Sequence, residues 1–126
     1  MAISYKHPMA QSECLTLSDM ANQSWIFPPP QALHYHLGLD SCKNHGFSPN
    51  VILTTSRAAT ALEYLHNHYS HCVYMEMNGI FDAYPSDRFR IIQIDHSLEF
   101  DFLFAWRKNV PLPKAAIEYL EYMKKD

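Results

Sequence analysis

Two short apolar runs, each followed by a helical stripe, limit the fold of this chain most strongly. Residues 25–27 read Trp-Ile-Phe and end at three consecutive prolines, after which a helix is predicted from Gln31. Residues 51–54 read Val-Ile-Leu-Thr and precede a second predicted helix. The two apolar stripes are Ala32, Tyr35, Leu39 and Cys42, and Ala58, Ala61, Leu62, Leu65 and Tyr69. Strands that alternate with helices favour an α/β fold, with mainly parallel strands in a mixed sheet flanked by helices.

Further elements extend this pattern towards both ends of the chain. We expect a strand at residues 3–5, a short helix after Leu15, a core strand at residues 73–75, a turn at Asn78-Gly79 and a strand at residues 89–94. The strand from Leu98 to Trp106 alternates strictly, which predicts antiparallel pairing with one covered face. Pro111 and Pro113 end it, and a last helix is predicted from Lys114 to Lys125.

Composition places the chain among single globular domains and excludes several functions. It has 126 residues, 48% of them hydrophobic and 18% charged, which is enough apolar material for a core. The formal net charge of -3 argues against binding nucleic acid through general electrostatics. With only 3 glycines, the chain has no Gly-rich phosphate loop. The 3 cysteines are an odd number and show no paired spacing, so we expect no disulfides and a reducing compartment. No apolar run approaches the about 20 residues that span a bilayer, and no apolar stretch follows the N-terminus. We therefore expect a cytoplasmic protein without a signal peptide.

The 8 histidines raise the alternative of a metal-binding protein or metalloenzyme. Within the two densest groups, His34 and His36 face different ways on a helix, as do His66 and His68; His68 and His71 could share a face. Neither HExxH nor CxxC occurs. We therefore expect surface histidines, no metal and no cofactor, and keep the metal-binding alternative as the second hypothesis.

No residue stands out as a catalytic group. The chain has no GxSxG elbow and no cysteine in a recognised reactive context. Glu76 could be an acid at a strand end, but a solvent-facing edge carboxylate is the favoured interpretation. The prediction is that the protein is not an enzyme.

A binding site is better supported, at the two junctions where a predicted strand leads into a helix. Ligands of open α/β sheets collect beyond the carboxyl ends of the strands, where free backbone N–H groups and the positive ends of helix dipoles point outward. The second junction adds hydroxyls and the Arg57 guanidinium, which suits bidentate recognition of a carboxylate. Alternatively, Thr55 or Ser56 simply caps the helix and Arg57 is solvated. Both interpretations stay open at this point.

Several short motifs, in order along nearly the whole chain, resemble the effector-binding domain of LysR-type transcriptional regulators. They are His7-Pro8-Met9-Ala10, Leu15-x-Leu17-x-Asp19-Met20, Trp25-Ile26, Gly46-Phe47-Ser48-Pro49, Ala61-Leu62, and Phe104-Ala105-Trp106-Arg107-Lys108-Asn109 before Pro113. The resemblance implies a type 2 periplasmic-binding-protein-like fold, in which two lobes bind a small inducer between them. Residues 3–84 are similar to the second lobe, and residues 85–126 to a C-terminal strand pair and helix, all within a single domain of residues 1–126. The DNA-binding helices and most of the first lobe have no counterpart here.

The resemblance also implies where an effector would bind. By position in the family, the effector-contacting residues are Pro29, Pro30 and Gln31 at the first junction and Ser56, Arg57 and Ala58 at the second. Thr55 joins them through its hydroxyl. We expect a small, carboxylate-bearing effector and no DNA binding by this chain alone.

The C-terminal segment leads to a prediction about partners. In the family, segment 98–106 and the last helix would pack on first-lobe elements that are absent here. Uncovered aromatic residues on an alternating strand would form a large exposed apolar patch, which monomers rarely tolerate. We therefore expect the segment either to fold back on its own lobe or to be buried by a second copy in a homodimer. A third hypothesis is a purely structural dimerisation module without a ligand pocket.

Overall fold

The sheet is mixed, and most of its strands run in one direction. The computed structural model describes residues 1–76, 78–84, 87–94 and 103–124. Its strands are β1 (Ala2–Ser4), β2 (Ser24–Phe27), β3 (Asn50–Thr54), β4 (Cys72–Tyr74) and β5 (Phe89–Ile91), in the order β3-β2-β4-β1-β5. β2 pairs in parallel with β3 and β4, whereas β1 pairs antiparallel with β4 and β5. Among these five strands only β1 is reversed, so the mainly parallel α/β sheet is confirmed.

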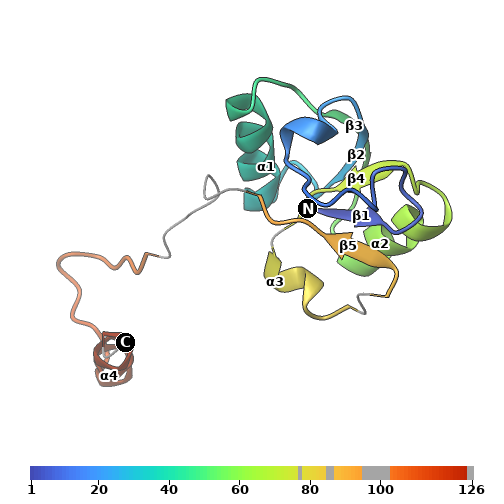
Figure 1. Ribbon diagram of the computed structural model, residues 1–126. Helices are drawn as coiled ribbons and strands as arrows, with labels where there is room; N and C mark the ends of the chain where they lie inside the picture. The colour runs from blue at the N-terminus through green and yellow to red at the C-terminus, as the bar shows by residue number, and fades with distance from the viewer. Residues whose placement is uncertain (77, 85–86, 95–102, 125–126) are drawn as a thin grey trace.

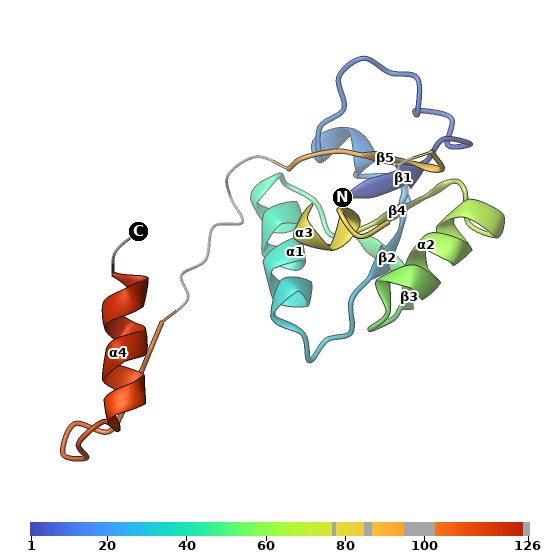
Figure 2. The ribbon, with the colours of Figure 1, turned by 90° about the horizontal axis from the view of Figure 1, so that it is seen from below.

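Helices cover both faces of this sheet. They are a 3-10 turn η1 (Ser18–Met20) and the α-helices α1 (Leu33–Asn44), α2 (Ala58–Asn67), α3 (Asn78–Phe81) and α4 (Lys114–Met123). α1 lies on one side of β2 and α2 on the other, as the view from below shows (Figures 1 and 2). None of the helices in the described ranges is long and apolar enough to cross a membrane.

The alternation of side chains along each short strand divides the core in two. Trp25 and Phe27 point to the α1 face of the sheet, and Ile26 between them points to the α2 face. On the α1 face they meet Cys42, with Tyr35 and Leu39 packed alongside. On the α2 face the buried helical residues are Ala61, Leu62 and Leu65. Both predicted helical stripes therefore face the core.

The motif His7-Pro8-Met9-Ala10 folds into a tight turn that closes the α1-face core. His7 is 3% exposed, and its Nδ1 accepts a hydrogen bond from the Met9 backbone N–H at 3.1 Å. The Ala10 N–H donates to the His7 carbonyl at 2.9 Å, and Ala10 is buried. Burial lowers the pKa of His7, which favours the neutral imidazole that this turn requires as an acceptor.

Three expectations about local structure are corrected. Asn78-Gly79 is not a turn but the beginning of α3. The strand predicted at residues 89–94 ends at Ile91, and its described partner is β1. Of the strand predicted from Leu98 to Trp106, residues 98–102 lie outside the described residues and residues 103–106 have no regular secondary structure. Over residues 103–106 the alternation was thus not enough to specify a strand, because a strand also needs a paired neighbour.

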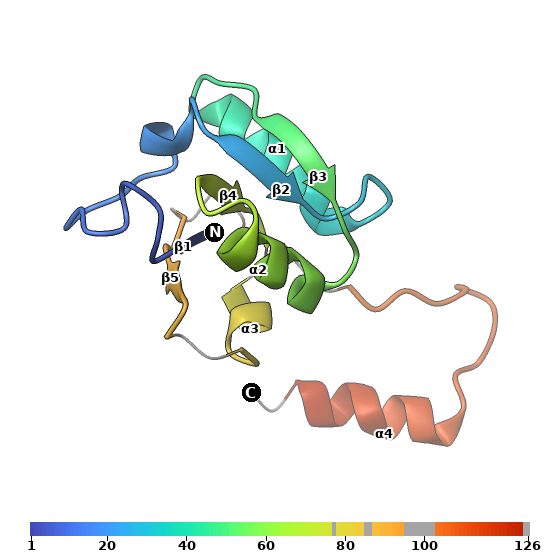
Figure 3. The ribbon, with the colours of Figure 1, turned by 90° about the vertical axis from the view of Figure 1, so that its right-hand side faces the viewer.

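The predicted last helix is present as α4, and it stands away from the sheet (Figure 3). No residue of α4 is buried. Leu103 is 86% exposed, Phe104 51% and Trp106 56%, and the Phe104 ring contacts Tyr119 of α4 at a centroid distance of 5.8 Å. These three side chains do not pack on their own lobe. The expectation that the segment folds back on its own lobe is therefore wrong over residues 103–106.

Candidate ligand-binding edge

Three parallel strands end side by side at one edge of the sheet. β2 lies between β3 and β4, and its last residues pair with the ends of both neighbours, Phe27 with Thr54 and Ile26 with Tyr74. Just beyond the strands, the Thr55 N–H donates to the Phe27 carbonyl at 3.1 Å and the Met75 N–H donates to the Ile26 carbonyl at 2.9 Å. Figure 3 shows β2 and β3 next to each other with arrowheads in the same direction. The chain therefore leaves all three strands at this carboxyl edge.

The structure brings the two predicted junctions together at this edge. The bond from Thr55 to Phe27 places the second junction beside the first. Pro30, Gln31, Ser56 and Arg57 are exposed, and Pro29, Thr55 and Ala58 are half-buried. Every residue predicted to contact an effector is thus at the carboxyl edge, with at least part of its surface open to solvent.

Neither long helix at this edge has a side-chain cap. α1 begins after Ala32 and α2 begins after Arg57, and no side-chain hydrogen bond caps either helix. Thr55 Oγ1 instead accepts a hydrogen bond from the Arg57 N–H at 3.2 Å, within the loop before α2. The expectation that Thr55 or Ser56 caps the helix is therefore wrong, because α2 begins one residue later than a Ser56 cap requires and two residues later than a Thr55 cap requires. Among the described residues no side chain caps α1 or α2, so backbone N–H groups of both first turns are left for a ligand at this edge.

Arg57 contributes a cation at the N-terminus of α2. Its side chain is exposed, and it makes no ion pair within the described part of the chain. A guanidinium beside the positive end of a helix dipole is an unfavourable arrangement that an anion would relieve. Its planar fork matches a carboxylate in bidentate geometry.

A buried carboxylate lies at the same edge, beyond β4. The side chain of Glu76 is only 7% exposed, and its Oε1 lies 3.3 Å from Nε2 of His34, in the first turn of α1. Its Oε2 accepts a hydrogen bond from the Tyr74 hydroxyl at 2.8 Å. Glu76 is therefore not the solvent-facing carboxylate that the sequence suggested, because two polar groups from different elements hold it at the strand end.

Burial, followed by the charge of Glu76 and the hydrogen bond to it, raises the pKa of Tyr74 well above its ordinary value. The phenol therefore stays protonated and remains a hydrogen-bond donor to Glu76. The three side chains, here called the Glu76 cluster, consist of Glu76, His34 and Tyr74. His34 is the most open member, with 27% of its side chain exposed.

One sequence signal points to the Glu76 cluster. Ligands collect beyond the carboxyl ends of parallel strands, which holds for β4 as well as for the two strands that lead into long helices. Glu76 follows the last residue of β4 by two positions. His34 could not be assigned to the cluster from sequence, because its contact with Glu76 depends on how α1 crosses the sheet.

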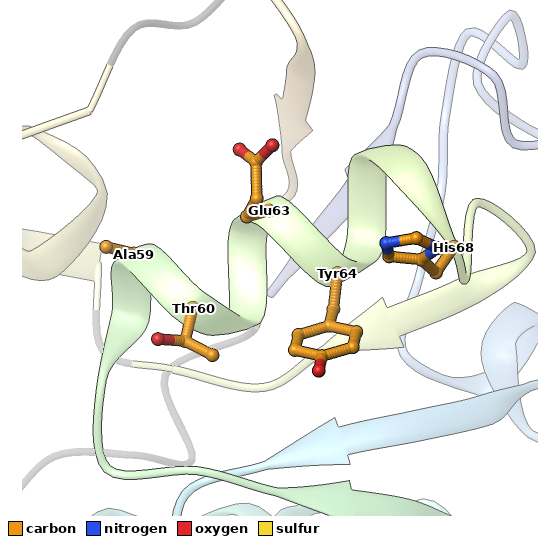
Figure 4. A pocket seen from close by; sticks show the side chains of 5 residues that line it. All are labelled: Ala59, Thr60, Glu63, Tyr64 and His68. Atoms are coloured by element: carbon orange, nitrogen blue, oxygen red, sulfur yellow. The ribbon is translucent and has the colours of Figure 1, made fainter.

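Two surface hollows lie along α2 rather than at the strand edge. One, of about 410 Å³, is lined by Ala59, Thr60, Glu63, Tyr64 and His68; Thr60 and Tyr64 point to one side of the helix and Glu63 to the other (Figure 4). The second, of about 310 Å³, shares Ala59 and Glu63 and is flanked by Arg88. Arg88 lies 3.9 Å from a carboxylate oxygen of Glu63. Neither hollow contains a residue predicted to bind an effector.

The histidines are dispersed over several elements. The His66 ring packs against Phe89, the His68 ring against Tyr64, and the His36 ring against Tyr35. In the described ranges, no three residues of the types His, Cys, Asp or Glu are grouped as a metal ion would require. Burial raises the pKa of Cys42 to about 12, so this thiol stays protonated within the core.

In a mixed α/β sheet with helices on both faces, the edge where the parallel strands end is the place at which ligands bind. The chain matches the LysR substrate binding domain over residues 1–126, and it belongs to that family. This domain is the effector-binding part of LysR-type regulators, so the chain has a ligand-sensing regulatory role in transcription, and the family is a regulatory one rather than a family of enzymes. No curated protein matches the chain at a significant level.

Proposed function

We propose that this chain senses a small carboxylate-bearing effector at the carboxyl edge formed by β2 and β3. The hydrogen bond from the Thr55 N–H to the Phe27 carbonyl carries this proposal, because it unites the two strand-to-helix junctions. The uncapped N-termini of α1 and α2 supply backbone donors, and Arg57 supplies the charge. Pro29, Pro30, Gln31, Ser56 and Ala58 form the surrounding surface. The effector lobe comprises residues 3–84, acts in the cytoplasm and performs no catalysis.

Calorimetric titration with a panel of organic acids tests this proposal. Arg57→Ala is expected to weaken the binding of the best acid about 10- to 100-fold, because a charge-assisted hydrogen-bonded pair contributes roughly 1.5–3 kcal/mol. Lys43→Ala is the matched control, since Lys43 is an exposed cation in the last turn of α1, at the other end of that helix. Equal affinities of Arg57→Ala and the unmodified protein would refute the role assigned to Arg57.

We also propose that a second copy of the chain covers the apolar side chains of segment 98–106 in a homodimer. The exposure of Leu103, Phe104 and Trp106 supports this, because three large apolar residues in one short segment are costly to leave in water. The dimer would present two effector edges, and residues 1–126 alone would not bind DNA.

Sedimentation across a range of concentrations tests the dimer. Trp106→Ser is expected to raise the dimer dissociation constant by at least about 10-fold, since buried tryptophans are frequent hot spots of interfaces. Tyr5→Ser, which removes an exposed aromatic ring beyond the end of β1, should leave it unchanged. A monomeric unmodified protein, or equal effects of both substitutions, would contradict the proposed interface.

A further inference from the structure

The Glu76 cluster and Arg57 lie on opposite sides of β2 at the same edge. Arg57 follows β3 and Glu76 follows β4, and β2 lies between these two strands. Adjacent strands are about 4.8 Å apart, so the ends of β3 and β4, which the two groups follow, are separated by two strand spacings, or about 10 Å. A small elongated ligand that lies across the end of β2 would reach both sides.

The geometry of the cluster makes His34 its outward-facing member. Glu76 is almost fully buried and has both carboxylate oxygens engaged, one near His34 Nε2 and one by the Tyr74 hydroxyl. Its charge therefore faces protein groups, among them His34 and the buried N-terminal amino group of Met1, rather than solvent. A carboxylate that accepts a hydrogen bond from one ring nitrogen of a histidine fixes the ring orientation and stabilises the imidazolium form, in which the other ring nitrogen also carries a proton and donates.

We infer that His34, oriented by Glu76, is a second anchor for the effector, and that the effector carries two acidic groups, one for Arg57 and one for His34. This inference rests on the proposed effector site and adds the class of ligand, a linear dicarboxylate. In this arrangement Glu76 is a positioning residue, which acts on the ligand only through His34. Tyr74 keeps Glu76 in place from the other face of the sheet.

Titration with linear dicarboxylates, from succinate to suberate, tests the inference when each is compared with its own monoamide. The monoamide keeps one carboxylate and the shape of the molecule but loses the second charge. In the unmodified protein, the best diacid is expected to bind about 10-fold tighter than its monoamide, the contribution of one charge-assisted hydrogen bond. In His34→Gln this preference should fall to nearly one, whereas in His36→Gln, an exposed histidine on the same helix, it should persist.

The substitution Glu76→Gln tests whether Glu76 orients the His34 ring or only contributes to the stability of the fold. It keeps the shape of the side chain, so the protein should remain folded, and the preference for the diacid should decrease several-fold. The ¹⁵N spectrum of the His34 imidazole provides a readout that needs no ligand: a proton on Nε2 is expected in the unmodified protein, with a clear change in Glu76→Gln. An unchanged imidazole spectrum would overturn the positioning role.

The remaining outcomes distinguish the failure of this inference from that of the effector site. If diacid and monoamide bind equally and Arg57→Ala weakens both, the effector site stands and the second anchor is refuted. If an amino acid binds better than any diacid and loses that advantage in Glu76→Gln, Glu76 contacts a cation directly and the dicarboxylate class is refuted. If no acid binds at all, the proposed effector site fails and the inference fails with it.

Discussion

Trp25→Ala is expected to lower the free energy of unfolding by about 3–5 kcal/mol, the usual cost of removing a large aromatic residue from a core. Trp25 is 0% exposed at the centre of the α1-face cluster, with its ring 5.8 Å from that of Phe27 and 6.1 Å from that of Phe47. Because small domains are stable by only about 5–15 kcal/mol, this loss is a large share of the total. Urea denaturation followed by circular dichroism measures it.

A second substitution, Trp25→Phe, separates the effect of the indole N–H group from that of the aromatic volume. The indole Nε1 of Trp25 is buried and has no hydrogen-bond partner in the described part of the chain, an arrangement that costs roughly 1–3 kcal/mol. Phenylalanine removes this unsatisfied donor and keeps most of the aromatic contacts. It should therefore cost well under half as much as alanine. A phenylalanine variant as unstable as the alanine variant would mean that the indole's particular shape, rather than apolar volume, stabilises this cluster.

Gly38→Val is expected to destabilise the protein by about 2–3 kcal/mol through overpacking. Gly38 is buried in α1, and a Cβ there would lie 2.8 Å from Met75 Cγ and 3.0 Å from Phe27 Cε1. Both neighbours are buried, so neither side chain can move away cheaply. The gain in helix propensity from glycine to valine is only a few tenths of a kcal/mol and does not offset this clash.

Asp40→Val is the control for Gly38→Val, since it places the same side chain on the exposed face of α1. Aspartate and valine have similar helix propensities, so this variant should change the free energy of unfolding by no more than about 0.5 kcal/mol. Thermal denaturation of the two variants side by side gives the difference. Equal stabilities would show that α1 can shift away from the sheet without cost.

Local patterns predicted those parts of the fold that depend on nearby residues. The apolar run at residues 25–27 and the stripe of Ala61, Leu62 and Leu65 became β2 and the buried face of α2. Asn78-Gly79 misled, because the same two residues that favour turns also begin the short helix α3. The pairing of β1 with β4 and β5 could not be predicted, since periodicity carries no information about which strands become neighbours.

The candidate site, like the fold, was predictable only where it depends on residues that are close together in the sequence. Arg57 and the prolines after β2 were identified, because they follow strands that lead directly into long helices. The Glu76 cluster was missed, because it forms only when β4 aligns with β2 and α1 brings its first turn over that strand. The burial of Glu76 is thus a property of three elements together, and the acidic residue alone resembles any surface glutamate.

The position of β1 has a consequence for how the protein is made. β1 precedes the other described strands in the sequence, yet Ala2 pairs with Tyr74 on one side and with Ile91 on the other. During synthesis, β1 therefore has no paired strand until β4 and β5 have left the ribosome. Such long-range pairing slows folding and leaves a strand open to aggregation in the interval. The five-stranded sheet can therefore be completed only after β4 and β5 have been translated.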